Sequence, residues 1–427
     1  MEATPREDAF SGLWIWEKVG DRLLWYLDVA SNRKPAKYLI AGRIPCDLDL
    51  SEPTDDELWV EHQRGTELFL DAWKGIREDG THLEDLPRPQ TSLVDLSVEL
   101  ALRMLRRCNF CRWNCRIDRS EGVKHGTCQL EAESRVSSYF HHRGEELVFR
   151  GVSGSGTIFF TSCNLRCSFC QNSNISEDKL NGIPLTPHQL AAAAWQLRME
   201  GCHNINWVGG DPTIHLHTIV QAIALLAKNQ VKLEDLDYVS VIKADLGRPT
   251  LSKEGGRYHG EVNVPMLWNS NFFMSPETMR ILRPLIDVWL PDFKFGNDKC
   301  SVFLARTPWY WETMSRNHQL IYDWGEDMVI RHLVMPNHVD CCTRPVLRWI
   351  AAHTPQALVN VMDQYHPDYA CDPADPNYDP QNEELARRPY DHEIQEAYDL
   401  AASLGLRYED VTFERAQIRR IFPRMGS

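Results

Sequence analysis

The interpretation of this chain of 427 residues depends on one stretch, residues 161–172, which is Thr161-Ser162-Cys163-Asn164-Leu165-Arg166-Cys167-Ser168-Phe169-Cys170-Gln171-Asn172. The cysteines have the spacing C-x3-C-x2-C and follow a β-branched and aromatic run, residues 157–161, that predicts a strand. Thiolates are soft ligands that suit iron–sulfur clusters. Because a four-iron cluster would receive only three thiolates here, its fourth iron stays open for another ligand, as in a catalytic metal site with one free position.

Two other interpretations of Cys163, Cys167 and Cys170 compete with the cluster. They are a zinc knuckle without its fourth ligand, and three structural cysteines buried in the core. Zinc sites usually pair two C-x2-C units, and a loop that follows a strand of a parallel sheet is an unusual place for one. The spacing and the strand before it therefore favour a [4Fe–4S] cluster held by this triad.

Strands and helices alternate on the carboxyl side of the triad. Proline in the first turn marks the start of a helix at 186–201, and glycine marks its end. The predicted strands are 157–161, 205–208, 264–268, 287–293, 329–334 and 358–362. This rhythm predicts an α/β fold with a parallel sheet. Six units are too few for a closed eight-stranded barrel, so we expect a partial (β/α)6 TIM-like barrel.

The chain divides into four parts by composition. A tryptophan-rich N-terminal extension occupies residues 1–95, and a cysteine-rich metal-binding segment occupies residues 96–150. The partial barrel covers residues 151–365, with an insertion near 231–262 in which residues 238–242 could form a further strand. Residues 366–427 are expected to be a C-terminal loop and helix.

The triad, with Phe169 directly before its last cysteine, resembles the signature of the radical S-adenosylmethionine (SAM) superfamily. The lead-in at residues 151–160, together with Gln171-Asn172 after the triad, is similar to the pyruvate formate-lyase-activating-enzyme-like branch. The resemblance covers about residues 105–365. It implies that the open iron chelates SAM, and that one electron from the reduced cluster cleaves SAM to a 5′-deoxyadenosyl radical that abstracts hydrogen from a substrate.

The resemblance also implies which residues bind SAM. Gly209-Gly210-Asp211-Pro212 follows the second strand and matches the family's Gly-Gly-acid-Pro segment, which contacts the SAM amino group. Many relatives have glutamate where this chain has Asp211. Four further residues at strand ends or within strands would line the SAM and substrate pocket: Asn269, Asp292, Lys294 and Arg331. The plainer alternatives are an ordinary glycine turn and surface or ion-paired side chains.

A second group of cysteines precedes the triad. Its spacing, C-x2-C-x3-C-x12-C, provides four thiolates at Cys108, Cys111, Cys115 and Cys128. Four thiolates suit a closed tetrahedral zinc site and equally suit a second [4Fe–4S] cluster. Free buried cysteines are the remaining alternative, and the resemblance supports a metal without naming it. We interpret the other cysteines as core or surface thiols: Cys46, Cys202, Cys300, Cys341, Cys342 and Cys371.

Composition excludes several classes of protein. The formal net charge of −14 leaves no basic footprint for nucleic acid and disfavours anionic membrane surfaces. The N-terminus, MEATPREDAF, lacks the features of a signal peptide, and no apolar run approaches the roughly 18 residues of a spanning helix. An odd count of 13 cysteines does not indicate a secreted disulfide framework. We therefore expect a soluble, cytoplasmic protein.

The leading functional hypothesis is a radical SAM oxidoreductase with no catalytic residue beyond its cluster ligands. One version activates a glycyl-radical enzyme, and another modifies a peptide or a small molecule. The alternative class is a non-catalytic iron–sulfur or zinc scaffold. By the same resemblance, the expected partners are a one-electron donor such as flavodoxin or ferredoxin and a possible protein substrate.

Overall fold

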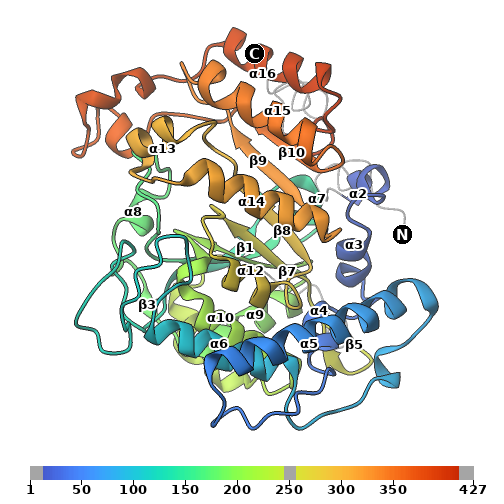
Figure 1. The fold of residues 1–427 in the computed structure, drawn as a ribbon. Coiled ribbons are helices and arrows are strands. Elements are labelled where there is room, and N and C mark those ends of the chain that lie inside the picture. The colour runs from blue at the N-terminus through green and yellow to red at the C-terminus, as the bar shows by residue number, and fades with distance from the viewer. Residues whose placement is uncertain (1–12, 245–255, 413–427) are drawn as a thin grey trace.

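The protein is built around a mostly parallel sheet curved into an open arc (Figure 1). The computed structural model describes residues 13–244 and 256–412. The parallel strands are β2 (Ser155–Phe160), β4 (Ile205–Gly209), β7 (Met266–Ser270), β8 (Val288–Pro291), β9 (Val329–Leu333) and β10 (Leu358–Met362). They lie side by side in chain order, and isolated parallel bridges at Trp289–Met328 and Asp292–Arg331 join β8 to β9. The predicted partial barrel is confirmed.

Two strands of the sheet, one long and one short, were not predicted. β1 (Arg135–His142) runs antiparallel to β2, and the short β3 (Ile183–Pro184) pairs with its first residues. β1 lies before the β-α repeat and carries several polar side chains, so neither the rhythm nor a continuous apolar run indicates it. It extends the arc at the β2 edge.

The further strand expected at residues 238–242 is wrong. The chain forms α11 (Leu236–Val239) followed by a 3-10 turn, η5 (Ser240–Ile242). Val239 is buried, but Val241, which a strand would place on the same face, is 74% exposed, so this segment does not bury the alternate side chains of a strand. The rest of the predicted insertion includes a two-stranded hairpin of β5 (Arg257–Tyr258) and β6 (Glu261–Val262), while residues 245–255 lie outside the described residues.

Period-two alternation along the strands separates a helix-facing layer from a cavity-facing layer. Trp207, Trp268 and Trp289 stand opposite one another on β4, β7 and β8, and all three are fully buried. Their neighbours on the other face, such as Val208 and Asn269, line a cavity. The tryptophan row is therefore the core, and the alternate positions are left for the site.

The helices cover the outer face of the arc (Figure 1). Their starts follow sequence signals, as at α9, where Thr186 and Gln189 form a capping box and Pro187 takes the first helical position. The helices of the barrel and the C-terminal part are α7 (Leu147–Arg150), α8 (Ser173–Ser176), α9 (Pro187–Met199), α10 (Leu216–Ala227), α12 (Pro276–Leu282), α13 (Asp298–Ala305), α14 (Tyr310–Asp323), α15 (Arg344–His353) and α16 (Asp391–Ser403). Within the described residues, no helix combines the length and the apolar character needed to cross a bilayer.

The N-terminal extension packs on the amino ends of the strands. Its helices are α2 (Leu13–Val19), α3 (Leu24–Ala30), α4 (Lys37–Ala41) and α5 (Asp55–Lys74), followed by α6 (Leu93–Arg106) of the cysteine-rich segment. Trp25 donates its indole N–H to Asp287 Oδ1 at 2.8 Å, and the Tyr26 amide donates to Asp327 Oδ2 at 2.8 Å. Since both carboxylates lie just before strands, the extension covers the end of the arc opposite the triad.

Candidate active site

A cavity of about 410 Å³ opens at the carboxyl ends of the parallel strands. All three cysteines of the triad line it from the loop after β2. The side chains facing them come from β4, β7, β9 and β10 and from the loop after β8. Of the predicted SAM-binding residues, the cavity is lined by Gly209, Gly210, Asn269, Asp292, Lys294 and Arg331.

The triad loop presents its sulfur atoms to donors of the surrounding chain. Asn271 donates its side-chain N–H to Cys163 Sγ at 3.4 Å, and the Leu165 amide lies at the same distance from that sulfur. The Ser176 hydroxyl is 3.2 Å from Cys170 Sγ. N–H and O–H groups aimed at sulfur stabilise thiolates, and such contacts tune iron–sulfur clusters.

The chemistry of the triad suits a bound metal group. Burial raises the pKa of Cys163 and Cys170 above the ordinary range and that of Cys167 to about 12. Without a metal these groups would be neutral thiols that satisfy few hydrogen bonds. Soft thiol ligands that line a cavity together fit a cluster, because metal binding converts them to thiolates and releases their protons.

Gly209 and Gly210 hold the end of β4 against the triad loop. Gly209 has φ +127°, and a Cβ there would lie 2.2 Å from the Phe160 nitrogen. A Cβ on Gly210 would lie 1.6 Å from the Ser162 carbonyl oxygen. Only glycine allows this approach, in which the Gly210 amide donates to Phe160 O at 2.8 Å. The pair places bare backbone beside Cys163, at the mouth of the cavity.

Asp211 has a different position from its glycine neighbours. Its side chain is buried, and its carboxylate accepts hydrogen bonds from the Thr213 amide, the Ser270 hydroxyl and the Asn271 amide. Burial raises the pKa of Asp211, and these donors oppose that shift. Asp211 does not contribute to the cavity lining, and its contacts position Asn271, which reaches Cys163.

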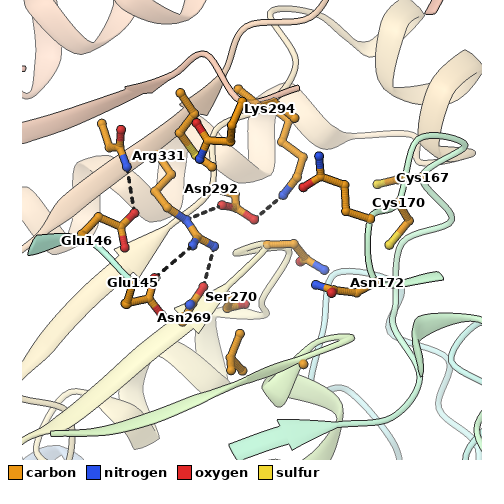
Figure 2. A pocket seen from close by; sticks show the side chains of 18 of the residues that line it. Glu145, Glu146, Cys167, Cys170, Asn172, Asn269, Ser270, Asp292, Lys294 and Arg331 are labelled. Carbon is orange, nitrogen blue, oxygen red and sulfur yellow. Dashed lines mark hydrogen bonds and ion pairs between the residues drawn. The ribbon is translucent and has the colours of Figure 1, made fainter. Parts of the chain in front are cut away.

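Charged side chains form a connected network across the cavity from the triad (Figure 2). Arg331 Nε donates to Asp292 Oδ1 at 2.9 Å, and Arg331 Nη2 donates to Asn269 Oδ1 at 2.6 Å. Asp292 also pairs with Lys294. Burial opposes ionisation, but the cations Arg331 and Lys294 hold the pKa of Asp292 below its ordinary value, and Asp292 in turn raises the pKa of Lys294.

Two adjacent carboxyl groups reach the inner floor of the arc. Glu145 lies 3.9 Å from Arg331 Nη1 and accepts from Asn206 of β4, while Glu146 accepts from Asn360 of β10 at 2.9 Å (Figure 2). Burial, then the charge of Glu145, raises the pKa of Glu146 to about 8. Glu146 is therefore the protonated member of the pair at neutral pH.

Comparison with known proteins indicates the family to which this site belongs. The family model described as the radical SAM superfamily matches residues 157–350, the stretch that carries the triad, the glycine pair and the charged network. An uncharacterised protein of Methanocaldococcus jannaschii is 34% identical over 387 residues, which cover 89% of this chain and 97% of that protein. The chain belongs to the radical SAM superfamily.

Three solved structures have a remote likeness to this chain. A radical SAM methyltransferase from Sphaerobacter thermophilus is 16% identical, with a TM-score of 0.38, over 78% of this chain and 92% of its own. Streptococcus suis SuiB bound to S-adenosylmethionine is 11% identical, with a TM-score of 0.40, over 62% of this chain and 50% of its own. A domain of pyruvate formate-lyase-activating enzyme from Bacteroides vulgatus is 11% identical, with a TM-score of 0.26, over 34% of this chain and 80% of its own.

The second cysteine group of this radical SAM protein packs against the triad loop. Trp113 donates its indole N–H to Asn164 O at 2.7 Å, and the Ser162 hydroxyl donates to Cys128 O. Cys108, Cys111 and Cys128 are buried and Cys115 is half-buried. Burial, then the charges of Cys108 and Cys128, raises the pKa of Cys111 far above its ordinary value, but no three of these four sulfur atoms lie within 4.8 Å of one another.

Sequence reasoning missed several residues that face the triad or the cavity. Glu145 and Glu146 precede a short helix in a segment with no motif, and Asn360 lies inside an otherwise apolar strand. Two features of the sequence could have indicated these residues: the acidic pair Glu145-Glu146 directly before an apolar run, and the lone polar Asn360 in a buried strand. Asn271 was also missed, although it lies only two positions after Asn269, which was predicted to line the pocket.

Proposed function

We propose that the protein reductively cleaves SAM at a [4Fe–4S] cluster held by Cys163, Cys167 and Cys170, and uses the product to abstract hydrogen from a substrate. The observation that carries this proposal is that one cavity holds the triad, the bare backbone of Gly209-Gly210 and a charged wall opposite them. A bound cluster with SAM would supply a 5′-deoxyadenosyl radical. The other residues that line the cavity would bind SAM and the substrate, orient them and enclose them.

The residues around the triad suit the charged end of SAM. Carbonyl groups at the Gly209-Gly210 turn can accept from its ammonium group, as the family resemblance implies for this segment. Burial lowers the pKa of Lys294, and Asp292 and then Cys167 raise it; because Lys294 lines the same cavity as the triad, its positive charge can balance thiolates or a carboxylate. Asp292 and Arg331 fix the orientation of Lys294 and close the wall behind it.

The far side of the cavity favours a polar substrate. Glu145, Glu146, Asn360 and Arg331 meet there, and Glu146 Oε2 is buried without a hydrogen-bond partner, so an apolar substrate would leave this oxygen unsatisfied. A protonated Glu146 beside an ionised Glu145 can donate to one polar group and accept from another. We propose either a glycyl residue of a partner enzyme or a polar group of a peptide or small molecule as the site of hydrogen abstraction.

Deuterium transfer tests this proposal and separates the two versions. The reconstituted, reduced protein is incubated with SAM and an extract of cells grown in deuterated medium, divided by size into a protein and a small-molecule fraction. Deuterium in 5′-deoxyadenosine from the protein fraction, with a glycyl-radical signal in electron paramagnetic resonance, supports activation of an enzyme. Deuterium from the small fraction alone supports a small-molecule substrate, and unlabelled product from both fractions contradicts hydrogen abstraction from a substrate.

We further propose that the electron donor docks beside the cysteine-rich segment. Its exposed basic side chains include Arg106, Arg107, Arg116 and Lys124, in a chain whose net charge is −14. Complementary charge steers the encounter of two proteins, so an acidic one-electron carrier such as flavodoxin or ferredoxin fits this face. The same segment contacts the triad loop through Trp113 and Cys128, which keeps the path for the electron short.

Cys108, Cys111, Cys115 and Cys128 are proposed to hold a second metal. A protein in which Cys163, Cys167 and Cys170 are all replaced by alanine should keep metal at this group, because the binding of a metal by these four thiolates contributes to folding. Iron with sulfide in that protein would identify a second cluster, and zinc without sulfide a structural site. A folded triple variant that contains neither would show that these cysteines do not bind metal.

The protonated Glu146 predicts a particular pH dependence of stability. Its pKa, about 8 in the folded protein, is above the value near 4.5 expected when unfolded, so the native state holds a proton that the unfolded chain releases. Stability therefore falls as pH rises from 6 to 8, by about 2 kcal/mol for this group. Glu146→Gln removes the effect, so the thermal midpoint of E146Q relative to wild type should rise by a few degrees between these pH values. The exposed Glu383→Gln is the control, and an unchanged difference for E146Q would contradict the assignment.

A further inference from the structure

Three cysteines and a histidine outside the SAM cavity converge on one point. Cys300 lies in the first turn of α13, His338 follows β9, and Cys341 and Cys342 belong to a π-helical turn, η7 (Val339–Thr343). Their ligand atoms all lie within 4.8 Å of one another, and within residues 13–244 and 256–412 this is the one such group of histidine, cysteine or acidic side chains. Cys300, His338 and Cys342 are buried, and Cys341 is half-buried. The cluster was not expected, because sequence analysis took these cysteines for core or surface thiols.

The separations suit a single tetrahedral ion. His338 Nδ1 lies 3.2 Å from Cys341 Sγ and 3.8 Å from Cys342 Sγ. Zinc bonds of about 2.0 Å to nitrogen and 2.3 Å to sulfur place tetrahedral ligand atoms roughly 3.5–3.8 Å apart. A four-iron cluster would bind each of its ligands to a different iron and needs the space of the cube between them. The compact group therefore favours one ion.

The surroundings hold the ligands in this arrangement. His338 Nε2 lies 3.2 Å from Glu384 Oε1, which leaves Nδ1 facing the sulfur atoms. Metal-binding histidines characteristically give their second nitrogen to a carboxylate or carbonyl in this way. Asn297 accepts from the Cys300 amide and donates to Cys341 O, both at 2.8 Å. Gly296 allows the two loops to meet, since a Cβ there would lie 2.5 Å from Cys341 O.

We propose that Cys300, His338, Cys341 and Cys342 bind one Zn²⁺ as a structural site. Four protein ligands leave no open position, so the ion is not expected to bind substrate. The site joins the start of α13, which follows β8, to the turn after β9; Asp292 directly follows β8 and Arg331 lies in β9. Zinc there would fix the wall of the SAM cavity from behind. The inference does not depend on the proposed SAM chemistry.

Metal analysis of matched variants tests the site. Full-length protein is produced with both iron and zinc in the medium, purified without oxygen, and compared with a C300S/C342S double variant and with C46S, which removes a cysteine of the N-terminal extension. The double variant should contain one zinc per chain less than C46S, whatever metal Cys108, Cys111, Cys115 and Cys128 hold. Equal zinc contents overturn the proposal. So does a disulfide between Cys300 and Cys341 or Cys342 in wild-type protein purified in this way, detected by mass spectrometry of unreduced peptides.

A second pair of variants keeps the test decisive if the double variant does not fold. Glu384 is exposed and its carboxylate lies against the far nitrogen of His338, so Glu384→Gln should leave the fold intact. Loss of such a carboxylate weakens metal binding by roughly 10-fold or more. The zinc released is measured as the concentration of a zinc chelator is raised. E384Q should release one zinc per chain at a correspondingly lower chelator concentration than the control, Glu383→Gln, which changes the neighbouring exposed carboxylate. Identical release curves overturn the assignment of His338 as a ligand.

Discussion

Replacing Cys167 by alanine should abolish SAM cleavage. The variant removes the middle thiolate of the triad, and the loop after β2 offers no substitute sulfur at that position. A cluster held by Cys163 and Cys170 alone would lose a second iron ligand and with it the defined open site. We expect 5′-deoxyadenosine at the level of the protein-free background, and a loss of about one cluster's iron per chain.

The control for this prediction is Cys46→Ala. Cys46 is also a buried cysteine, but it lies in the extension and does not line the cavity. C46A should cleave SAM at the wild-type rate, which separates loss of a ligand from loss of any cysteine. A C167A protein with wild-type cleavage would show that the triad does not hold the catalytic cluster.

Gly210→Ala should reduce SAM cleavage by roughly 100-fold or more, although no reacting group is removed. The new Cβ would lie 1.6 Å from the Ser162 carbonyl oxygen and 3.3 Å from the Cys163 nitrogen. Both are backbone atoms, so the clash cannot be relieved by turning a side chain. The loop that carries the triad must move away from β4, and the hydrogen bond from the Asp211 amide to Ser162 O at 3.0 Å would be lost.

Gly325→Ala distinguishes this displacement from the general cost of replacing a glycine. Gly325 has φ +67° and open space around its Cα, so alanine there costs only backbone strain of about 1 kcal/mol. G325A should keep cleavage close to wild type, with a small fall in the thermal midpoint. Equal cleavage by G210A and wild type would contradict the close approach of β4 to the triad loop.

The fold could be predicted from the sequence because its repeat is regular. Each predicted parallel strand corresponds to an observed one, and the helix starts at Thr186 and Ser275 have capping residues that the structure uses. The failures have local causes. β1 is a partly polar strand at the side of the arc, and residues 238–242 have apolar residues without a surface to cover.

The site could be predicted only where a motif fixes it. The triad and Gly209-Gly210 are contiguous in sequence, and the polar residues at strand ends follow from the topology of a parallel sheet. Glu145 and Glu146 lie on the floor because of how the segment before α7 packs, which no local pattern encodes. Likewise Cys300 and His338 are brought together by the approach of two loops, and their spacing of 38 positions carries no signal.

The central claim is that the triad cavity binds and reductively cleaves SAM. The most direct measurement is the yield of 5′-deoxyadenosine and methionine when anaerobically reconstituted, reduced wild-type protein is incubated with SAM. Our account predicts equal amounts of both products, formed only when the cluster, the reductant and SAM are all present. A protein that carries a full complement of reduced [4Fe–4S] cluster at Cys163, Cys167 and Cys170 and forms neither product would contradict it.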